Sequence, residues 1–168
     1  MRNLPCLKWL CLLSVLLLAV ASSITARAQD PVAGVNVQIE PLIGDGHFCL
    51  DIHADRTQDG VPVFIYGCHN VENQRWTITS SNDNRHAIVG AAGMCLDVRG
   101  TNSQANGTPT QVWQCHFGDN QRLSFSPDGR IREVRSGKCL MAVAPRDGAP
   151  LILNDCRNTP QEVFVIRK

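Results

Sequence analysis

Three stretches of this sequence repeat one another, and this repeat limits the fold more than any other feature. Each stretch opens with Cys-Leu, and the three openings are 46 and 44 positions apart. Each reaches a second cysteine after 19, 20 or 17 positions, and then a glutamine after 6, 6 or 5 more, at Gln74, Gln121 and Gln161. Such a period is typical of units that cannot bury an apolar face alone. Three copies favour closure about an axis over an open solenoid.

Within each repeat, the local pattern predicts four short strands. Apolar and polar residues alternate over short runs, which Gly, Pro, Asn and Asp separate. The expected strands are 37–44, 49–52, 63–68 and 75–79 in repeat one, 87–93, 95–98, 110–115 and 122–126 in repeat two, and 131–137, 139–143, 150–156 and 163–167 in repeat three. No window beyond the N-terminal segment carries a long helical stripe. The prediction is an all-β domain of twelve strands in three sets of four.

The N-terminus has the pattern of a secretory signal peptide. Arg2 and Lys8 precede an apolar run at 10–20, and Ala26-x-Ala28 supplies the small residues before a cleavage site. We expect 1–28 to be the signal peptide, 29–36 a short lead and 37–168 the domain. An uncleaved anchor is the alternative, and bulky residues before Cys11 disfavour a lipoprotein anchor there. The protein is therefore expected to be secreted, or periplasmic if its source is bacterial.

Size and charge limit the partners. Removing 28 of the 168 residues leaves 140, the size of one domain. The formal charge is +1 with acidic and basic residues interspersed, and aromatic residues make up 5% of the chain. We therefore expect no nucleic-acid partner and no membrane insertion, because neither a basic face nor a polybasic segment is present.

Six cysteines remain once Cys6 and Cys11 leave with the signal peptide. An even number in an exported chain indicates disulfides. The repeat favours one equivalent bridge in each third: Cys49–Cys68, Cys95–Cys115 and Cys139–Cys156. Zinc is the alternative, because a histidine follows Cys68 and Cys115. Structural zinc uses closely spaced ligand pairs, however, and the sequence has no Cys-x-x-Cys. We expect no metal and no cofactor.

These residues resemble the ricin-B-type lectin domain, a β-trefoil with three Gln-x-Trp repeats. The marks are the three Cys-Leu openings, the paired cysteines, "PTQVWQC", and "NQRW", "NQRL" and "PQEV" as Gln-x-Trp and its decayed copies. The resemblance covers about 37–168. It implies a six-stranded barrel capped by three hairpins, with pseudo-threefold symmetry. It also implies a core filled by Trp76, Leu123, Val163, Ile78, Phe125 and Val165.

The resemblance further implies a sugar pocket in each repeat. A hexose needs an acceptor for hydroxyl protons, an aromatic plate for its C–H face and an amide that donates and accepts. Repeat two offers Asp97, Trp113 and Asn120, with Gln111 beside the plate and Gln121 able to brace the carboxylate.

Repeat one matches this set with one departure. Asp51, Tyr66, Asn73 and Gln74 correspond, but Phe64 replaces the glutamine, so this pocket should be weaker or select a different sugar.

Repeat three has Met141 in place of the aspartate, Asn154 in place of the aromatic residue and Pro160 in place of the asparagine. Without an acceptor or a plate, it should not bind sugar and should serve as a structural third.

Each site residue also has a purely structural explanation. Trp113 and Tyr66 could be buried strand residues. Asp97 and Asp51 could accept backbone N–H groups in turns, and Gln74 and Gln121 could be wholly structural. The sequon at Asn106 would be glycosylated only in a eukaryotic secretory route.

The expected function is that of a lectin for galactose-like or related glycans. The alternatives are a targeting subunit with a separate catalytic partner chain, and a β-trefoil protease inhibitor. We expect no enzymatic activity. Glycoside hydrolysis needs two carboxyl groups about 5 to 9.5 Å apart, whereas Asp51 and Asp97 belong to different thirds. No Ser/His/Asp arrangement on a nucleophile elbow is recognisable either.

Overall fold

The computed structural model describes residues 32–55, 57–100 and 105–168. The twelve expected strands are all present, four to a repeat. They are β1 (Gly34–Pro41), β2 (Phe48–Ile52), β3 (Val61–Gly67), β4 (Trp76–Ile78), β5 (Ile88–Val89), β6 (Cys95–Val98), β7 (Thr108–Trp113), β8 (Leu123–Phe125), β9 (Ile131–Glu133), β10 (Cys139–Ala142), β11 (Ala149–Asn154) and β12 (Phe164–Arg167).

The expected signal peptide lies outside the described residues. β1 begins at Gly34, so the last three residues of the expected lead already belong to the sheet. Among the described residues, no helix is long and apolar enough to cross a membrane.

Five short 3-10 helices connect the strands: η1 (His53–Asp55), η2 (Glu72–Gln74), η3 (Ala91–Gly93), η4 (Asp119–Gln121) and η5 (Pro160–Glu162). Three of them, η2, η4 and η5, precede the last strand of their repeats and therefore occupy equivalent places.

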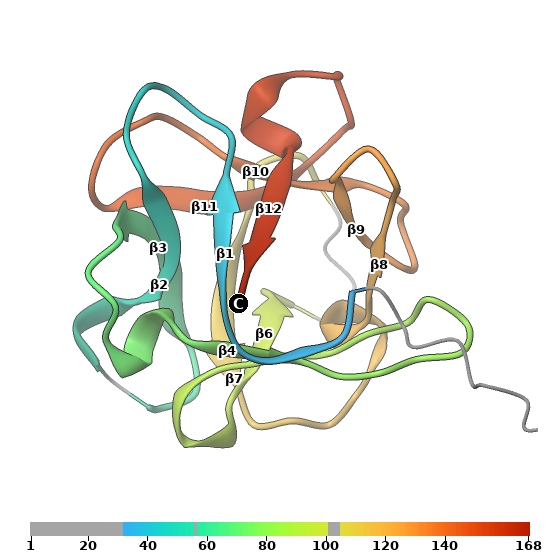
Figure 1. Ribbon diagram of the computed structural model, residues 1–168. Coiled ribbons are helices and arrows are strands. Elements are labelled where there is room, and N and C mark those ends of the chain that lie inside the picture. The colour runs from blue at the N-terminus through green and yellow to red at the C-terminus, as the bar shows by residue number, and fades with distance from the viewer. Residues whose placement is uncertain (1–31, 56, 101–104) are drawn as a thin grey trace, which may run out of the picture.

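Six strands close into a barrel. β1 pairs with β4 and β12, β4 with β5, and β8 with β9. Isolated bridges complete the ring, from His86 to Leu123 and from Arg130 to Val163. β1 and β12 lie side by side in Figure 1, so the two ends of the domain meet in this barrel. Closure removes the exposed strand edges that an open sheet would carry.

The other six strands form three hairpins that cap the barrel. The hairpins are β2–β3, β6–β7 and β10–β11, one in each repeat. The second strand of each hairpin pairs with the second strands of the other two, β3 with β7, β7 with β11, and β11 with β3. This mutual pairing gives the pseudo-threefold arrangement, and the expected β-trefoil is confirmed.

The core is built around Trp76. Its ring is fully buried and its Nε1–H donates to the carbonyl of Leu50 at 3.1 Å, so the one polar atom is satisfied. Gly90 packs against this ring, because a Cβ atom there would lie 2.8 Å from both Ile52 Cδ1 and Trp76 Cζ3. Leu123 and Ile78 are also buried as expected, and Phe125 packs against the core while partly buried.

The core prediction for repeat three is wrong by one residue. Val163 and Val165 are only half-buried, whereas Phe164 is 5% exposed and belongs to the core, with Ile166 packed against it. Phe164 begins β12 as Trp76 begins β4, so it takes the place of the Trp in this decayed Gln-x-Trp copy.

The three expected disulfides are confirmed. Cys49–Cys68, Cys95–Cys115 and Cys139–Cys156 each bridge the first strand of a hairpin to the segment that follows its second strand. In each repeat, the bridge ties the loop leading into the following 3-10 helix to the hairpin, and this loop borders the candidate sites.

Candidate functional site

The carboxylate of Asp97 is held by three side-chain amides in repeat two. Gln111 Nε2 donates to Oδ1 at 3.0 Å, and Asn120 Nδ2 and Gln121 Nε2 donate to Oδ2 at 2.7 and 3.0 Å. The pairing of β6 with β7 sets Asp97 opposite Gln111, and η4 brings the other two amides. Asp97 as a whole residue is 2% exposed. Among the described residues, this carboxylate accepts its hydrogen bonds from side-chain amides. The alternative that Asp97 accepts backbone N–H groups in a turn is therefore wrong.

Gln121 positions both the carboxylate and the neighbouring loop. It is fully buried, and its Oε1 accepts the backbone N–H groups of His116 at 2.9 Å and Phe117 at 3.0 Å. Its Nε2 also donates to the carbonyl of Gln114 at 3.1 Å. These bonds leave no surface for a ligand, so the structural alternative holds for this residue.

Asn120 presents its carbonyl oxygen. Its Nδ2 donates both to Asp97 and to the carbonyl of Val98, at 2.7 and 3.2 Å, which uses its two hydrogens within the protein. The side chain is half-buried. Oδ1 is therefore the atom of this amide that can accept a hydrogen bond from a ligand.

An open hollow of about 790 Å³ lies over this network. The residues lining it are Gly60, Asp97, Arg99, Gly100, Gln111, Trp113, His116 and Asn120. Trp113 is 39% exposed, so the alternative that its ring belongs to the core is wrong. A carboxylate, an indole and an amide thus line one surface hollow.

Burial raises the pKa of Asp97, while the bonds from Gln111 and Gln121 and the nearby His116 act in the opposite direction. His116 Nε2 lies 3.6 Å from Asp97 Oδ2. The backbone N–H of Gly118 donates to Nδ1 of the same ring at 3.0 Å. The neutral ring therefore carries its hydrogen on Nε2, beside the carboxylate.

Repeat one holds the equivalent network. Asn73 Nδ2 donates to Asp51 Oδ1 and to the carbonyl of Ile52, both at 3.1 Å, and Gln74 Nε2 donates to Asp51 Oδ2 at 2.9 Å. Asn73 Oδ1 is buried and has no hydrogen-bond partner among the described residues. Tyr66 is 45% exposed, so core burial is wrong for this residue too.

Gln74 is fully buried and fixes its loop as Gln121 does. Its Oε1 accepts the backbone N–H of His69 at 2.9 Å, and its Nε2 also donates to the carbonyl of Gly67 at 3.1 Å. Its role is to position Asp51 and the loop.

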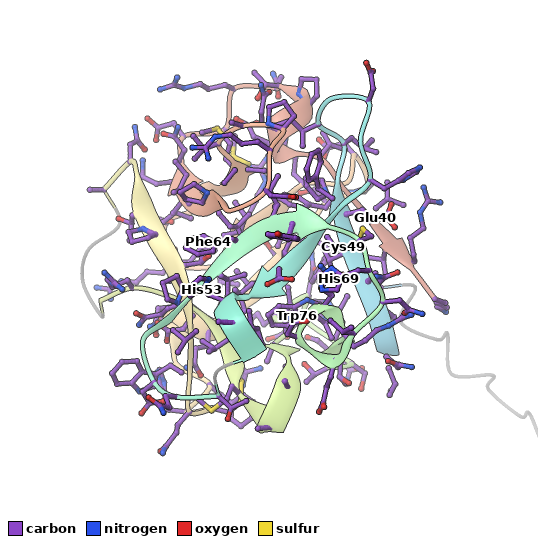
Figure 2. All side chains as sticks on the ribbon, turned by 90° about the vertical axis from the view of Figure 1, so that its left-hand side faces the viewer. Glu40, Cys49, His53, Phe64, His69 and Trp76 are labelled. Atoms are coloured by element: carbon purple, nitrogen blue, oxygen red, sulfur yellow. A yellow bond between two sulfur atoms is a disulfide. The ribbon has the colours of Figure 1, made fainter. Side chains whose placement is uncertain are left out.

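Besides the change of plate from Trp113 to Tyr66, the two sites differ at one pair of neighbouring side chains. In repeat two, Arg99 Nε donates to Gln111 Oε1 at 3.1 Å. In repeat one, the corresponding residues are His53 and Phe64, whose rings meet edge to face with centroids 5.3 Å apart (Figure 2). A polar pair thus flanks one carboxylate and an aromatic pair flanks the other, which is a physical basis for different selectivity.

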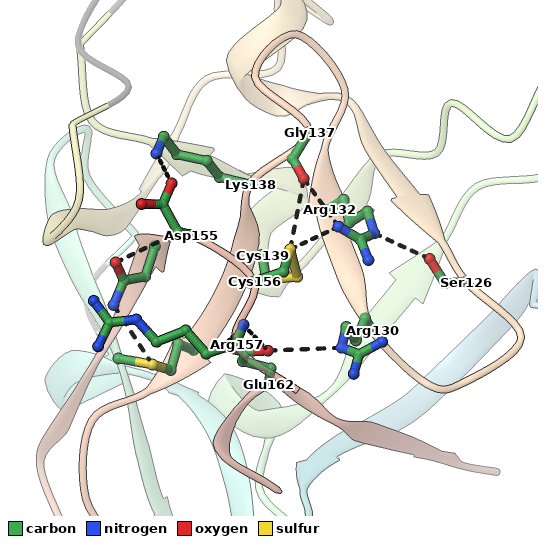
Figure 3. Close-up of a disulfide and its surroundings, with 12 residues drawn as sticks. Ser126, Arg130, Arg132, Gly137, Lys138, Cys139, Asp155, Cys156, Arg157 and Glu162 are labelled. Carbon is green, nitrogen blue, oxygen red and sulfur yellow. Dashed lines mark hydrogen bonds and ion pairs between the residues drawn. A yellow bond between two sulfur atoms is a disulfide. The ribbon is translucent and has the colours of Figure 1, made fainter. Parts of the chain in front are cut away.

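Repeat three has lost the carboxylate on its hairpin. Asn154 Nδ2 lies 3.8 Å from Met141 Sδ, where the other repeats place an aromatic residue and an aspartate. Repeat three instead carries a carboxylate on η5, that of the fully buried Glu162. Figure 3 shows the Glu162 carboxylate accepting the backbone N–H of Arg157, with Arg130 Nε 3.6 Å from it. The carboxylate also accepts the backbone N–H of Asn158.

Glu162, rather than Gln161, is thus the counterpart of Gln74 and Gln121. Its carboxylate binds loop N–H groups as their amide oxygens do. By the same shift, Gln161 rather than Pro160 takes the place of the asparagine. In repeats one and two, this glutamine lies six residues after the second cysteine, and the same spacing in repeat three leads to Glu162. Matching the residue type instead leads to Gln161, which lies five residues after the cysteine.

Two residues at the hollow were not anticipated as site residues. The sequence pattern points to His116 only as a zinc ligand, and it does not point to Arg99. Both could have been found from their place next to the repeat's marks: His116 follows a cysteine of the bridge and Arg99 stands two residues after Asp97.

The disulfides bear on the zinc alternative. Cys68 and Cys115 are oxidised, so they do not supply the thiolates that zinc requires. Glu40, Cys49 and Cys68 place ligand-type atoms within 4.8 Å of one another, but both sulfurs belong to one disulfide. Only the carboxylate of Glu40 is then a usable ligand.

The sequon residue Asn106 is engaged with repeat three. Its Nδ2 donates to Asp155 Oδ2 at 2.7 Å, and its Oδ1 accepts from Lys138 Nζ at 2.8 Å. An N-linked sugar would replace one of the two Nδ2 hydrogens, so it would have to be accommodated beside Asp155.

A closed β-trefoil with a carboxylate, an indole and an amide in one hollow is the architecture of a sugar-binding module. The chain matches the ricin-type β-trefoil lectin domain over residues 36–162, and it belongs to that family. Family membership supports carbohydrate binding.

Nigrin b of Sambucus nigra is 34% identical over 104 residues, which are 62% of this chain and 18% of that protein. The β-galactoside-specific lectin 2 of Viscum album is 37% identical over 71 residues, 41% of this chain and 12% of that lectin. The chain thus spans less than a fifth of either relative. Among solved structures, the designed 3-fold symmetric protein ThreeFoil aligns with a TM-score of 0.73 at 23% identity, covering 79% of this chain and 97% of that one. This likeness shows the fold.

Proposed function

We propose that this protein is a secreted lectin that binds galactose-like or related sugars through repeat two. The observation that carries the proposal is that the buried carboxylate of Asp97, the exposed ring of Trp113 and the amide of Asn120 line one hollow. The name of the Viscum album relative, a β-galactoside-specific lectin, supports the class of sugar.

Each group has a distinct task in this proposal. Asp97 Oδ1 carries one bond from Gln111 and can accept one sugar hydroxyl, and Asn120 Oδ1 can accept another. The indole covers the C–H face of the ring. His116 can donate through Nε2. A shallow site of this kind gives millimolar affinity, about −4 kcal/mol.

Repeat one is proposed as a second, weaker or differently selective site. It has the carboxylate of Asp51, held by Asn73 and Gln74, and the exposed ring of Tyr66. Two sites on one chain would raise the avidity for clustered glycans. Repeat three, without acceptor or plate, is proposed to be structural.

The test is a glycan array on the parent and on Trp113→Ala. We expect this variant to lose most of the signal of repeat two, and to lose the remainder when Tyr66→Ala is added. Because Trp113 is more than one-third exposed, the melting temperature should change little. Met141→Ala, at the position equivalent to Asp97, is the matched control and should bind like the parent. Binding by Trp113→Ala equal to that of the parent would refute the site.

The runner-up is a glycan-targeting subunit with a separate catalytic chain. The small share of each relative that this chain covers favours it. Co-purification of an enzyme with the native protein would support it. We propose that the chain itself has no catalytic activity, because its two site carboxylates lie in different repeats. A protease inhibitor would inhibit proteases regardless of Trp113, so inhibition assays on both proteins separate that alternative.

A further inference from the structure

A second hollow lies beside the first, on the other side of the loop between β7 and η4. It encloses about 660 Å³, and its lining residues are Ser80, Ser81, Asn82, Asp83, Arg85, Phe117, Asp119 and Arg122. The two hollows share no lining residue, but both are lined by residues of 116–120, at the end of the β7–η4 loop and the start of η4. His116 and Asn120 line the first, and Phe117 and Asp119 line the second.

Phe117 is the unusual residue of this hollow. Its side chain is 49% exposed and its φ is +55°, a left-handed conformation that is strained for a bulky residue. The residues two positions after the second cysteine in the other repeats are Asn70 and Asn158, with φ of +63° and +61°. Asparagine tolerates this conformation. Neither the backbone nor the core therefore explains an aromatic residue here.

The ring of Phe117 is held in place from one side. The guanidinium carbon of Arg122 lies 5.3 Å from its centroid. Arg122 Nε donates to the carbonyl of Phe117 at 3.2 Å and its Nη1 donates to the carbonyl of Arg85 at 3.0 Å. The aromatic plate and the guanidinium are thus arranged before any ligand arrives.

The opposite wall, the turn between β4 and β5, is also fixed. Asn84 Nδ2 donates to the carbonyl of Phe125 at 3.0 Å, and Asn84 Oδ1 accepts the N–H of the same residue at 2.9 Å. Ser81 Oγ donates to Asp83 Oδ1 at 2.6 Å and accepts the N–H of Arg85 at 2.9 Å. A preformed wall lowers the ordering cost of binding.

The charges of the hollow favour a neutral polar ligand. Its two carboxylates, Asp83 and Asp119, are matched by the two guanidinium groups of Arg85 and Arg122. A ligand of either sign would meet like charge. Carboxylates accept pairs of hydroxyl protons, guanidinium groups donate, and an exposed ring covers C–H groups. Together these groups fit a neutral sugar ring.

We propose that this second hollow is a subsite for a further sugar ring of the glycan whose terminal sugar occupies the Trp113 hollow. The proposal rests on the proposed function and deepens it: the ligand is an oligosaccharide that crosses the loop at His116–Asn120. Phe117 stacks on the further ring, and Asp119 and Arg122 bond its hydroxyls.

Phe117→Asn tests the subsite, because it restores the residue that both other repeats carry at this conformation. An array of mono- to hexasaccharides identifies the best-bound oligosaccharide. That oligosaccharide and the methyl glycoside of its terminal sugar are then titrated by calorimetry. The parent should prefer the oligosaccharide, and the variant should lose roughly five- to tenfold of this preference, the worth of one stacked ring. Its melting temperature should not fall. Val143→Ala, which trims an exposed apolar side chain in repeat three, should keep the parent's ratio.

Two results overturn the subsite. One is an unchanged affinity ratio in Phe117→Asn. The other is an Arg122 Nε–H resonance in the parent that does not shift on adding the oligosaccharide. In either case, terminal-sugar binding that still depends on Trp113 would leave the proposed function standing. If the parent binds no sugar on the array, the proposed function fails and the subsite fails with it.

Discussion

Gln121→Glu tests whether the amide of this residue, rather than its shape, supports the candidate site. The change exchanges NH₂ for oxygen in a fully buried side chain. Nε2 now donates to Asp97 Oδ2 at 3.0 Å and to the carbonyl of Gln114 at 3.1 Å. An ionised Glu at this position would face two acceptors, one of them a carboxylate.

The penalty follows from these contacts. Two charges 3.0 Å apart repel by about 5 kcal/mol at an effective dielectric constant of about 20. Keeping the new carboxyl protonated at pH 7 costs less, about 3.7 kcal/mol from an unfolded pKa of about 4.3. The folded protein should therefore hold it neutral, and its proton can serve only one of the two acceptors. The other bond is lost, at about 1 kcal/mol. The variant should be destabilised by about 4–5 kcal/mol at pH 7.

Urea unfolding of parent and variant at pH 7 and pH 5 measures this penalty. The folded pKa of the new carboxyl is raised, so the penalty is present above the unfolded pKa and shrinks as the pH falls toward it. At pH 5 it should be about 2 kcal/mol.

Glu162→Gln is the reverse exchange in repeat three, where Met141 replaces the aspartate. It removes the charge that faces Arg130, so it should destabilise the fold at pH 7 and at pH 5 alike. An equal loss by Gln121→Glu at both pH values, or no loss at all, would refute the electrostatic explanation.

Two further predictions concern pH and the disulfides. Because burial raises the pKa of Asp97, its carboxylate should take up a proton, and sugar affinity should fall, at a pH above the usual value of about 3.9 for aspartate. The same shift means that ionised Asp97 destabilises the fold above its unfolded pKa, and that protonation relieves this cost. Calorimetric titrations should therefore show a loss of sugar affinity at a pH where thermal unfolding still shows a folded protein. An affinity that falls only together with unfolding would contradict this. Replacing Cys95 and Cys115 with serine opens a loop with a sequence separation of 20 and should cost about 3 kcal/mol in urea unfolding, whereas a loss below about 1 kcal/mol would show that the denatured chain gains little freedom.

The architecture could be predicted because it is written in spacings along the chain. The cysteine pairs and the strand alternation recur in register, so the twelve strands and the three bridges followed from the repeat, and the family resemblance implied the trefoil. The family resemblance implied that Asp97, Trp113 and Asn120 belong to one site, and the structure brings them to one hollow. The failures came where one copy had drifted: in repeat three the buried residues are Glu162 and Phe164, not Gln161 and Val163.

By itself the sequence determined the strands and the disulfide of each repeat, because a pair of cysteines and a run of alternating residues constrain only the segment in which they lie. Tertiary structure decided which atoms remain for a ligand. Asn120 keeps Oδ1 because Asp97 and Val98, more than twenty residues earlier, consume its Nδ2 hydrogens. The second hollow exists because the turn at Ser80–Arg85 meets Phe117 and Arg122 across the barrel edge. Such convergence depends on how the strands pair in space, and no spacing within a single repeat encodes it.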